Sequence, residues 1–299
     1  MNILITGATG LIGTALSRSL TASGHTVYPL VRDEHSTSPF HWFPLKNKIH
    51  LDDSIKLDAV IHLAGENIAD KRWNQQRKME ILNSRENATK LLTNALTHLT
   101  NNPKVLISSS AIGFYGDTGD ESVDENSAAG SGFLSEVASR WEQATQAAEE
   151  AGIRTVHIRT GIVLSPHGGI LKQMMLPFKL GLGGIVGNGR QYLSCVNIDE
   201  ITGMIHFILE NETISGPINL VSRTPVTNAE FTRALGKALR RPTLFPLPAF
   251  MARVMFGEMA DALLLSSTKV LPARLDAAGF IFKNDDLETT LKSLLDKDR

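Results

Sequence analysis

A glycine-rich turn close to the start of the chain constrains the fold more than any other feature. Residues 1–6 form a short apolar run, and Gly7-Ala8-Thr9-Gly10-Leu11-Ile12-Gly13 follows it directly. Apolar residues then recur at helical spacing up to Gly24, and a second apolar run ends at Arg32. The order strand, glycine turn, helix, strand is typical of a unit that binds a dinucleotide.

Each glycine of the turn has a separate physical task. Gly7 permits the tight turn, Gly10 lets the backbone approach a diphosphate, and Gly13 lets the helix pack closely on the sheet. The helix then directs free N–H groups and the positive end of its dipole toward the phosphates. We therefore expect residues 7–13 to bind the diphosphate of a cofactor; a purely structural glycine turn is the alternative.

The end of the second strand selects the cofactor. An acidic side chain there binds the 2′-hydroxyl of the adenosine ribose, whereas an arginine suits a 2′-phosphate. Arg32 occupies this place and Asp33 follows it. We predict NADP(H) with Arg32 as its ligand. Two alternatives stay open: Asp33 turns inward, or Arg32 is a surface cation.

Composition excludes several classes of function. The 299 residues contain 30 basic and 31 acidic side chains, for a formal net charge of −1. This balance argues against a nucleic-acid partner and a membrane contact, because both depend on clustered positive charge. The single cysteine, Cys195, forms no intramolecular disulfide, and the histidines show no metal-ligand pairing. We expect a cytoplasmic protein with a small-molecule substrate and no metal.

Further apolar runs predict the rest of a sheet. Residues 57–65, 104–110 and 155–159 are strand-like, and helical stretches separate them. This alternation predicts an α/β fold with a Rossmann-type, doubly wound parallel sheet. Ligands in such sheets lie outside the carboxyl ends of the strands. We therefore expect further cofactor contacts where these strands end, at Leu63, Ala64, Gly65, Glu66, Ser108, Arg159, Gly161 and Val163.

Several short motifs resemble a known family. They are the glycine turn, His62-Leu63-Ala64-Gly65, Asn87-Ala88-Thr89, Ser108-Ser109-Ser110-Ala111, Tyr115-Gly116, Phe133-Leu134, Trp141-Glu142, Arg159-Thr160-Gly161, the stretch from Gly181 to Gln191, and the segment from Pro225. Over nearly its whole length the chain resembles the extended short-chain dehydrogenase/reductases, and among them the atypical epimerase family proteins (YfcH-like) of the NAD(P)-dependent epimerase/dehydratase family. The resemblance implies a Rossmann fold, a nicotinamide cofactor and a small C-terminal domain.

The chain departs from that superfamily at the catalytic pair. Members use a Tyr-x-x-x-Lys pair on the helix after the serine strand, where the tyrosine transfers a proton and the lysine lowers its pKa. Here the corresponding region contains Phe133, and Val137 or Ala138 stands where the lysine belongs. Tyr115 is the preferred substitute for the tyrosine. The other candidate catalytic residues are Ser109 and Ser110, which suit a substrate carbonyl, and Asn87, which matches the superfamily's helix asparagine.

Three arginines are candidate substrate contacts. Arg85 lies on a helix expected at the edge of the cleft, Arg72 precedes that helix, and Arg is suited to bidentate recognition of phosphate or carboxylate. A surface ion pair is the alternative for both. Arg190 lies two residues before Tyr192, which stands roughly where superfamily members that act on nucleotide-sugars carry an arginine. The resemblance therefore does not extend to nucleotide-sugar substrates.

The composition changes near residue 164. We predict an NADP-binding domain at 1–164 with a return segment at about 194–222, and a mainly helical substrate domain at 165–193 and 223–299. Thr227 and Glu230 predict a capping box for a helix that ends near Arg241, and residues 285–288 begin a final helix. The apolar segment 246–265 is expected to form core, with a substrate pocket or a subunit contact, as in a homodimer, as alternatives.

The sequence leaves two functions open. The first is an NADP(H)-dependent oxidoreductase or epimerase-like enzyme that acts on a small carbonyl or alcohol compound. The second is a catalytically silent NADP(H)-binding redox sensor or regulatory protein. The missing Tyr and Lys favour the second, whereas the serine strand and the second domain favour the first.

Overall fold

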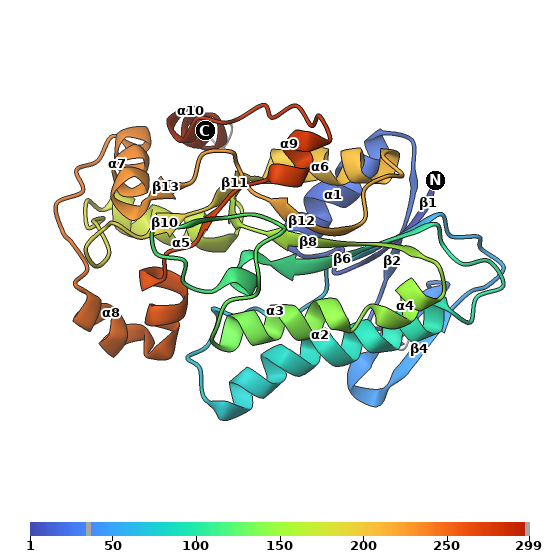
Figure 1. Cartoon of the computed structure of the whole chain (residues 1–299). Coiled ribbons are helices and arrows are strands. Elements are labelled where there is room, and N and C mark those ends of the chain that lie inside the picture. Colours follow the sequence, from blue (N-terminus) through green and yellow to red (C-terminus); the bar gives the residue numbers. More distant parts are fainter. Residues whose placement is uncertain (34–36, 297–299) are drawn as a thin grey trace.

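The structure, a computed structural model, describes residues 1–33 and 37–296. Six parallel strands form one sheet in the order β12-β8-β6-β5-β1-β2 (Figure 1). They are β1 (Asn2–Thr6), β2 (Thr26–Leu30), β5 (Ala59–His62), β6 (Val105–Ala111), β8 (Arg154–Thr160) and β12 (Gly216–Leu220). The order runs outward from β1 in both directions, which confirms the predicted doubly wound Rossmann-type sheet.

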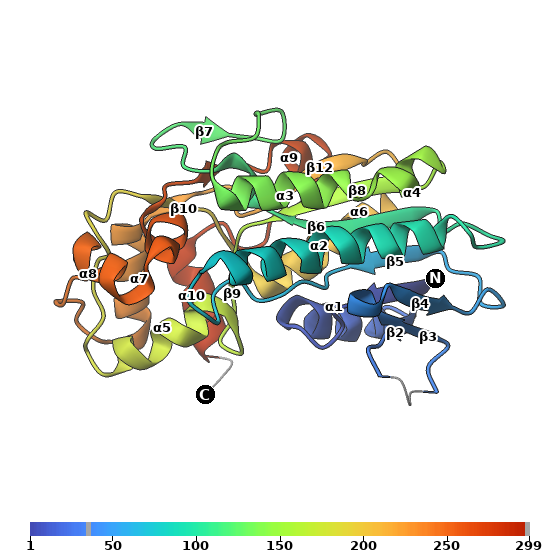
Figure 2. The same ribbon diagram turned by 90° about the horizontal axis from the view of Figure 1, so that it is seen from below.

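Helices cover both faces of the sheet. One face carries α1 (Leu11–Ala22) and α6 (Ile198–Glu210); the other carries α2 (Gln75–Leu96), α3 (Phe133–Gln143) and α4 (Gln146–Glu150) (Figure 1). Figure 2 shows α2 and α3 side by side across the sheet. Alternate residues of each strand face opposite layers, so Val105 and Ile107 pack with α1 and α6, while Leu106 packs with α2 and α4.

Among the described residues, a hairpin and no α-helix lies between β2 and β5. Its strands β3 (Phe40–Phe43) and β4 (Lys48–Leu51) pair antiparallel around the 3₁₀ turn Pro44–Lys46. Phe40 and Trp42 are buried with the core residues on the α2 face. The hairpin therefore covers part of the sheet that a crossover helix would otherwise cover.

Short strands and helices complete the chain. The strands pair as β9 (Ile162–Leu164) with β11 (Cys195–Asn197), β10 (Tyr192–Leu193) with β13 (Val226–Thr227), and β7 (Ser122–Val123) with β14 (Lys269–Val270). The remaining helices are α5 (Gly169–Lys179), α7 (Asn228–Leu239), α8 (Ala249–Phe256), α9 (Ala273–Ala277) and α10 (Leu287–Asp296), with a 3₁₀ turn at Ile112–Tyr115 and a π-helix at Ala260–Leu265. None of the described helices is long and apolar enough to cross a membrane.

Helices α5, α7, α8 and α10 gather at the carboxyl end of the sheet, opposite the amino terminus (Figure 1). The predicted capping box is present, because Thr227 and Glu230 bond each other's backbone N–H at the start of α7. Buried residues of α5, α7 and α10 form an apolar cluster to which Leu11 and Ile12 of α1 add contacts. The two predicted domains therefore share a packed interface beside the glycine turn.

The expectation that residues 246–265 form core is wrong for α8. Its side chains Phe250, Val254 and Met255 are 67%, 72% and 58% exposed, and Ala252 alone among its residues is buried. Met259, just after the helix, is buried against Trp73 and Phe133. An apolar segment without a polar face is typical of a buried helix. Among the described residues, however, no other element covers the exposed side chains of α8.

Candidate functional site

The glycine turn has the geometry that a dinucleotide needs. Gly7 has φ +68°, a region that favours glycine, and its carbonyl accepts a 2.9 Å hydrogen bond from the Gly10 N–H. A Cβ on Gly13 would lie 2.1 Å from the Gly7 carbonyl oxygen, so α1 packs on the turn at a distance that glycine alone allows. At Gly10 a Cβ would meet only that same carbonyl, at 3.2 Å, and the residue is exposed.

The start of α1 is available to an anion. Gly10 is the N-cap and offers no side-chain acceptor, and the first N–H groups of a helix have no partner within it. By contrast, α7 satisfies its first turn with the Thr227 and Glu230 side chains. Thr9 and Gly10 are both exposed. The residues present therefore fit the diphosphate of a dinucleotide.

A buried chain of three neutral side chains holds the base of this turn. Thr6 Oγ accepts hydrogen bonds from the backbone N–H groups of Leu63 and Ala64, both at 3.1 Å. Its own hydrogen therefore points at His62 Nδ1, 2.7 Å away, and His62 donates from Nε2 to Thr89 Oγ at 2.9 Å. Burial lowers the pKa of His62 to about 4, which keeps the ring neutral.

The turn after β5 lies against the glycine turn. A Cβ on Gly7 would lie 3.0 Å from the backbone nitrogen of Ala64, so the two loops touch through their backbones. Arg85 holds the far side of the β5 turn: it donates to the carbonyl of Glu66 at 3.0 Å and lies over the Trp141 ring, 4.8 Å from its centre. Burial lowers the pKa of Arg85 to about 10. Leu63, Ala64, Gly65 and Glu66 are thus placed beside the predicted diphosphate site.

The other predicted arginine contacts lie on the surface. Arg32 is exposed directly after β2, where a 2′-phosphate contact was predicted. Arg72 is exposed, although its guanidinium lies close enough to Gly257 that a Cβ there would meet Nε at 2.8 Å. Arg190 is exposed in the loop before β10. The neighbouring Arg77, which no motif in the sequence indicated, is buried and pairs with Asp70 at 2.7 Å.

The end of β6 carries a buried charged network. Arg159 of β8 donates to both carboxylate oxygens of Glu142 on α3, each at 2.8 Å. Ser110 donates to the same carboxylate at 2.6 Å. A third Arg159 nitrogen donates to the Tyr115 hydroxyl at 3.0 Å, and Tyr115 in turn donates to Asn219 of β12 at 2.8 Å. Five side chains from five parts of the chain thus meet at one edge of the sheet.

This network occupies two predicted site residues. Tyr115 is 3% exposed, both its donor and its acceptor are used, and burial raises its pKa. Arg159 is 4% exposed, and its guanidinium lies 3.5 Å from the centre of the Phe114 ring. Both residues therefore bond within the protein, and these bonds use three of the five Arg159 N–H groups.

The three serines of β6 face different layers. Because alternate residues face opposite sides, Ser108 and Ser110 point toward the α2 and α3 layer and Ser109 toward the α1 and α6 layer. Ser108 is fully buried and its hydroxyl has no hydrogen-bond partner among the described residues. Of the three, only Ser110 is bonded to a charged side chain, Glu142.

Gly161 and Val163 follow β8 at the crossing to β9. A Cβ on Gly161 would lie 2.4 Å from the Ser194 carbonyl oxygen, so a packing requirement explains this glycine. Val163 pairs with Val196 of β11 and is half-buried. Both residues therefore pack against the segment that contains β11, where the chain leaves the large sheet.

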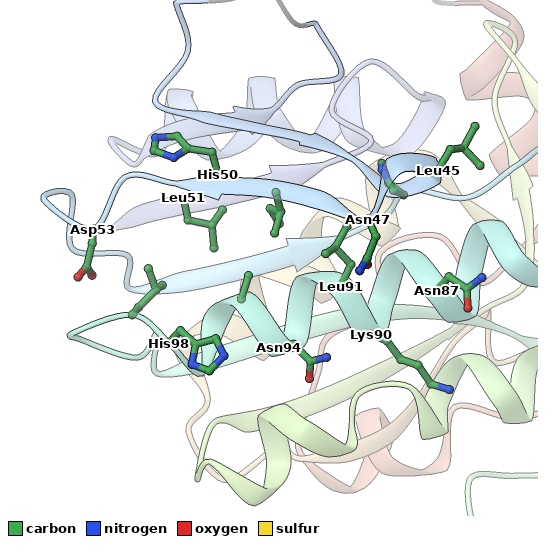
Figure 3. A pocket seen from close by; sticks show the side chains of 14 residues that line it. Leu45, Asn47, His50, Leu51, Asp53, Asn87, Lys90, Leu91, Asn94 and His98 are labelled. Atoms are coloured by element: carbon green, nitrogen blue, oxygen red, sulfur yellow. The ribbon is translucent and has the colours of Figure 1, made fainter.

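Asn87 lies on the exposed face of α2. It is exposed and lines an open groove of about 890 Å³ between α2 and the β3–β4 hairpin, together with Lys90, Asn94 and His98 (Figure 3). Its helix neighbour Thr89 is the residue that reaches the sheet, through His62.

Two kinds of chemistry have no support in the described residues. No three His, Cys, Asp or Glu side chains among residues 1–33 and 37–296 are grouped to hold a metal ion. Cys195 is buried, and burial raises the pKa of its thiol to about 12, so it is not an activated nucleophile.

Sequence reasoning missed Thr6 and Glu142. Thr6 is the last residue of an apolar strand, and its polar side chain at a strand end was the available signal. Glu142 lies one turn after Ala138 on the buried face of α3, so a carboxylate interrupts an apolar stripe. A charge in such a place needs a buried partner, but its identity depends on the fold.

Comparisons with known proteins agree with this architecture. The sequence profile of the NAD dependent epimerase/dehydratase family matches residues 3–220, and that of a domain of unknown function, DUF1731, matches residues 247–294. An epimerase family protein of Mycobacterium bovis is 41% identical over 290 residues, which cover 97% of this chain and 96% of that protein. Epimerase family protein SDR39U1 of Mus musculus is 37% identical over 300 residues, 99% of this chain and 100% of that protein.

Solved structures extend the comparison. The crystal structure of human epimerase family protein SDR39U1 (isoform2) with NADPH has a TM-score of 0.90 and 33% identity, and the match covers 99% of both chains. The UDP-glucose 4-epimerase of Thermus thermophilus in complex with NAD has a TM-score of 0.74 at 15% identity, covering 99% of this chain and 98% of that one. At that identity the second match shows the shared fold alone.

Proposed function

Since the chain belongs to the NAD dependent epimerase/dehydratase family, we propose that it is an NADP(H)-dependent oxidoreductase or epimerase-like enzyme acting on a small carbonyl or alcohol compound. The observation that carries the proposal is the uncapped start of α1 behind a turn that requires glycine at Gly7 and Gly13. The human relative crystallised with NADPH supports the same cofactor. When bound, the nicotinamide supplies hydride transfer.

The protein's own residues supply binding and orientation. The first N–H groups of α1 would hold the diphosphate, and exposed Arg32 would meet a 2′-phosphate. Thr6 and His62 fix the glycine turn and the turn after β5, beside which the cofactor would lie. Ser110 would contact the substrate, with Ser109 and Tyr115 as the further predicted catalytic residues. Arg72, Arg85 and Arg190 stay predicted substrate contacts, and a homodimer and a cytoplasmic location stay predictions.

Arg32 offers the direct test of the cofactor. Calorimetry should show tighter binding of NADPH than of NADH, because the guanidinium pairs with the additional phosphate. Arg32→Ala should reduce NADPH affinity by about tenfold, the size of one exposed charge-assisted contact, and leave NADH unchanged. Arg18→Ala, which removes another exposed arginine from α1, is the matched control. Equal affinities for both cofactors in the unaltered protein would refute the NADP(H) proposal.

The second candidate is a catalytically silent NADP(H)-binding sensor. It is favoured by α3, which carries neither the tyrosine nor the lysine of the superfamily and whose Glu142 lies in an ion pair. A carbonyl library with NADPH separates the two candidates. Steady oxidation of NADPH supports the enzyme, whereas tight NADPH binding without turnover supports the sensor.

A further inference from the structure

Ser110 lies where a ligand contact is expected. It is the residue before last of β6, at the carboxyl edge of the sheet, where ligands of such folds bind. Its side chain faces α3 and is 4% exposed, so a ligand group that contacts it loses its own contact with water. Whether this hydroxyl donates or accepts a hydrogen bond therefore affects which ligand group binds there.

The hydrogen of Ser110 is already used within the protein. Arg159 binds both oxygens of Glu142 and holds the group as a carboxylate, which accepts hydrogen bonds and donates none. The 2.6 Å contact between Ser110 and Glu142 must then use the serine's only hydrogen. Among the described residues no donor reaches Ser110 Oγ, so its lone pairs have no partner in the protein.

We propose that Glu142 is a positioning residue that fixes Ser110 as a hydrogen-bond acceptor, so that the site binds a ligand through a hydroxyl group and not through a carbonyl oxygen. The proposal rests on the proposed function, because it concerns the substrate of that site. It reverses the expectation that Ser110 donates to a carbonyl. A hydroxyl pairs with the free lone pairs of Ser110, whereas a carbonyl oxygen meets them with lone pairs of its own.

The network explains why this polarity is stable. Arg159 also donates to Tyr115, and Tyr115 donates to Asn219, so the hydrogen bonds of this network run in one direction. If the Ser110 hydrogen turned toward a ligand, the buried Glu142 carboxylate would lose one of its hydrogen-bond donors. The fold therefore selects one direction of the hydrogen bond before any ligand arrives.

The test compares matched alcohols and ketones in complexes that cannot react. Cyclohexanol is titrated into the protein with NADPH and cyclohexanone into the protein with NADP⁺, with 2-butanol and 2-butanone as a second pair, and binding is followed by ligand-observed NMR. In the unaltered protein the alcohol should bind about tenfold more tightly, as expected for one buried hydrogen bond. The ratio of alcohol affinity to ketone affinity in each protein is divided by the same ratio in Ser110→Ala, so that the effect of the two cofactor forms cancels.

Glu142→Gln should reverse the preference. The amide oxygen would stay with the Arg159 nitrogen that bonds Oε2, and the amide NH₂, in the place of Oε1, would face Ser110, which would then direct its hydrogen toward the ligand. Arg159 Nε would lose its acceptor in this variant, so its stability is measured alongside. Ser110→Ala removes the hydroxyl without touching the ion pair, so it tests the proposal even if Glu142→Gln fails to fold. The control is Glu149→Gln, a half-exposed carboxylate that bonds Thr145 and not Ser110.

The outcomes separate two failures. Equal affinities, a preference for the ketone, binding of neither member, or a ratio that Ser110→Ala leaves unchanged would overturn the role of Glu142 while NADPH still binds. Failure of the unaltered protein to bind NADPH would instead overturn the proposed function. Reversal in Glu142→Gln with an unchanged ratio in Glu149→Gln would support the proposal, since a purely structural loss cannot invert a preference.

Discussion

The ends of β1 and β6 lie at the same edge of the sheet but are built in opposite ways. At the end of β1 the glycine turn exposes Thr9 and Gly10, its proposed binding groups are backbone N–H, and the side chains beneath it are neutral. At the end of β6 the proposed binding group is a serine side chain, and the carboxylate of a buried ion pair holds it. A backbone site needs only the right φ angles and close packing, whereas a side-chain site depends on every partner around it.

The largest expected effect comes from breaking the backbone site. Gly13→Ala places a methyl group 2.1 Å from the Gly7 carbonyl oxygen, so the turn or α1 must move. We expect the free energy of unfolding to fall by more than about 3 kcal/mol, as for severe overpacking. NADPH affinity should fall by about a hundredfold. Urea unfolding and calorimetry measure the two quantities.

Gly203→Ala is the matched control for this substitution. Gly203 lies inside α6, and its Cβ would meet nothing closer than Phe280 at 3.8 Å. Replacing a helix-interior glycine should raise stability by about 0.5–1 kcal/mol and leave NADPH binding intact. If Gly13→Ala bound NADPH as tightly as Gly203→Ala, the turn would not be the diphosphate site.

The same contrast explains what the sequence could predict. The glycine turn, the alternation of strands and helices and the capping box of α7 depend on local patterns, and all three are as expected. The family resemblance also holds, because its motifs lie along most of the chain. By contrast, the exposed apolar side chains of α8 were expected in the core, since hydrophobicity alone does not say which elements will cover a helix.

The serine site shows the limit of such patterns. Ser110, Glu142 and Arg159 come from three elements, and Asn219 from a fourth. Nothing near Tyr115 in the sequence shows that its hydroxyl is used by Arg159 and Asn219. Which side chains remain free for a ligand is a property of the assembled sheet edge, and only the structure supplies it.

The next effect concerns the buried chain of neutral side chains beneath the glycine turn, formed by Thr6, His62 and Thr89. Burial lowers the pKa of His62 from 6.5 to about 4, so the unfolded chain takes up a proton at higher pH than the folded protein. The stabilisation is therefore complete above about pH 6.5 and is lost as the pH falls toward 4. The shift corresponds to about 3 kcal/mol.

His62→Gln isolates this contribution. The amide keeps one donor for Thr89 and one acceptor for Thr6 but does not titrate. Stability measured by urea unfolding between pH 4 and 7 should fall more steeply in the unaltered protein than in the variant. If the free energy of unfolding fell equally with pH in both proteins, burial would not lower the pKa of His62. The contrast between the neutral side chains at the end of β1 and the ion pair at the end of β6 would then be weaker.

The smallest effect separates the two roles of Tyr115. Tyr115→Phe leaves the Asn219 oxygen without its donor and one Arg159 nitrogen without its acceptor, in a place that is 3% exposed. The free energy of unfolding should fall by about 1–3 kcal/mol, with NADPH affinity unchanged, because the glycine turn lies at another strand. Thermal and urea unfolding measure the loss, and Tyr28→Phe, at a half-buried tyrosine on β2, is the control. Loss of turnover at unchanged stability would show instead that the hydroxyl leaves its partners to act on the substrate, and the β6 end would then be as open to ligand as the end of β1.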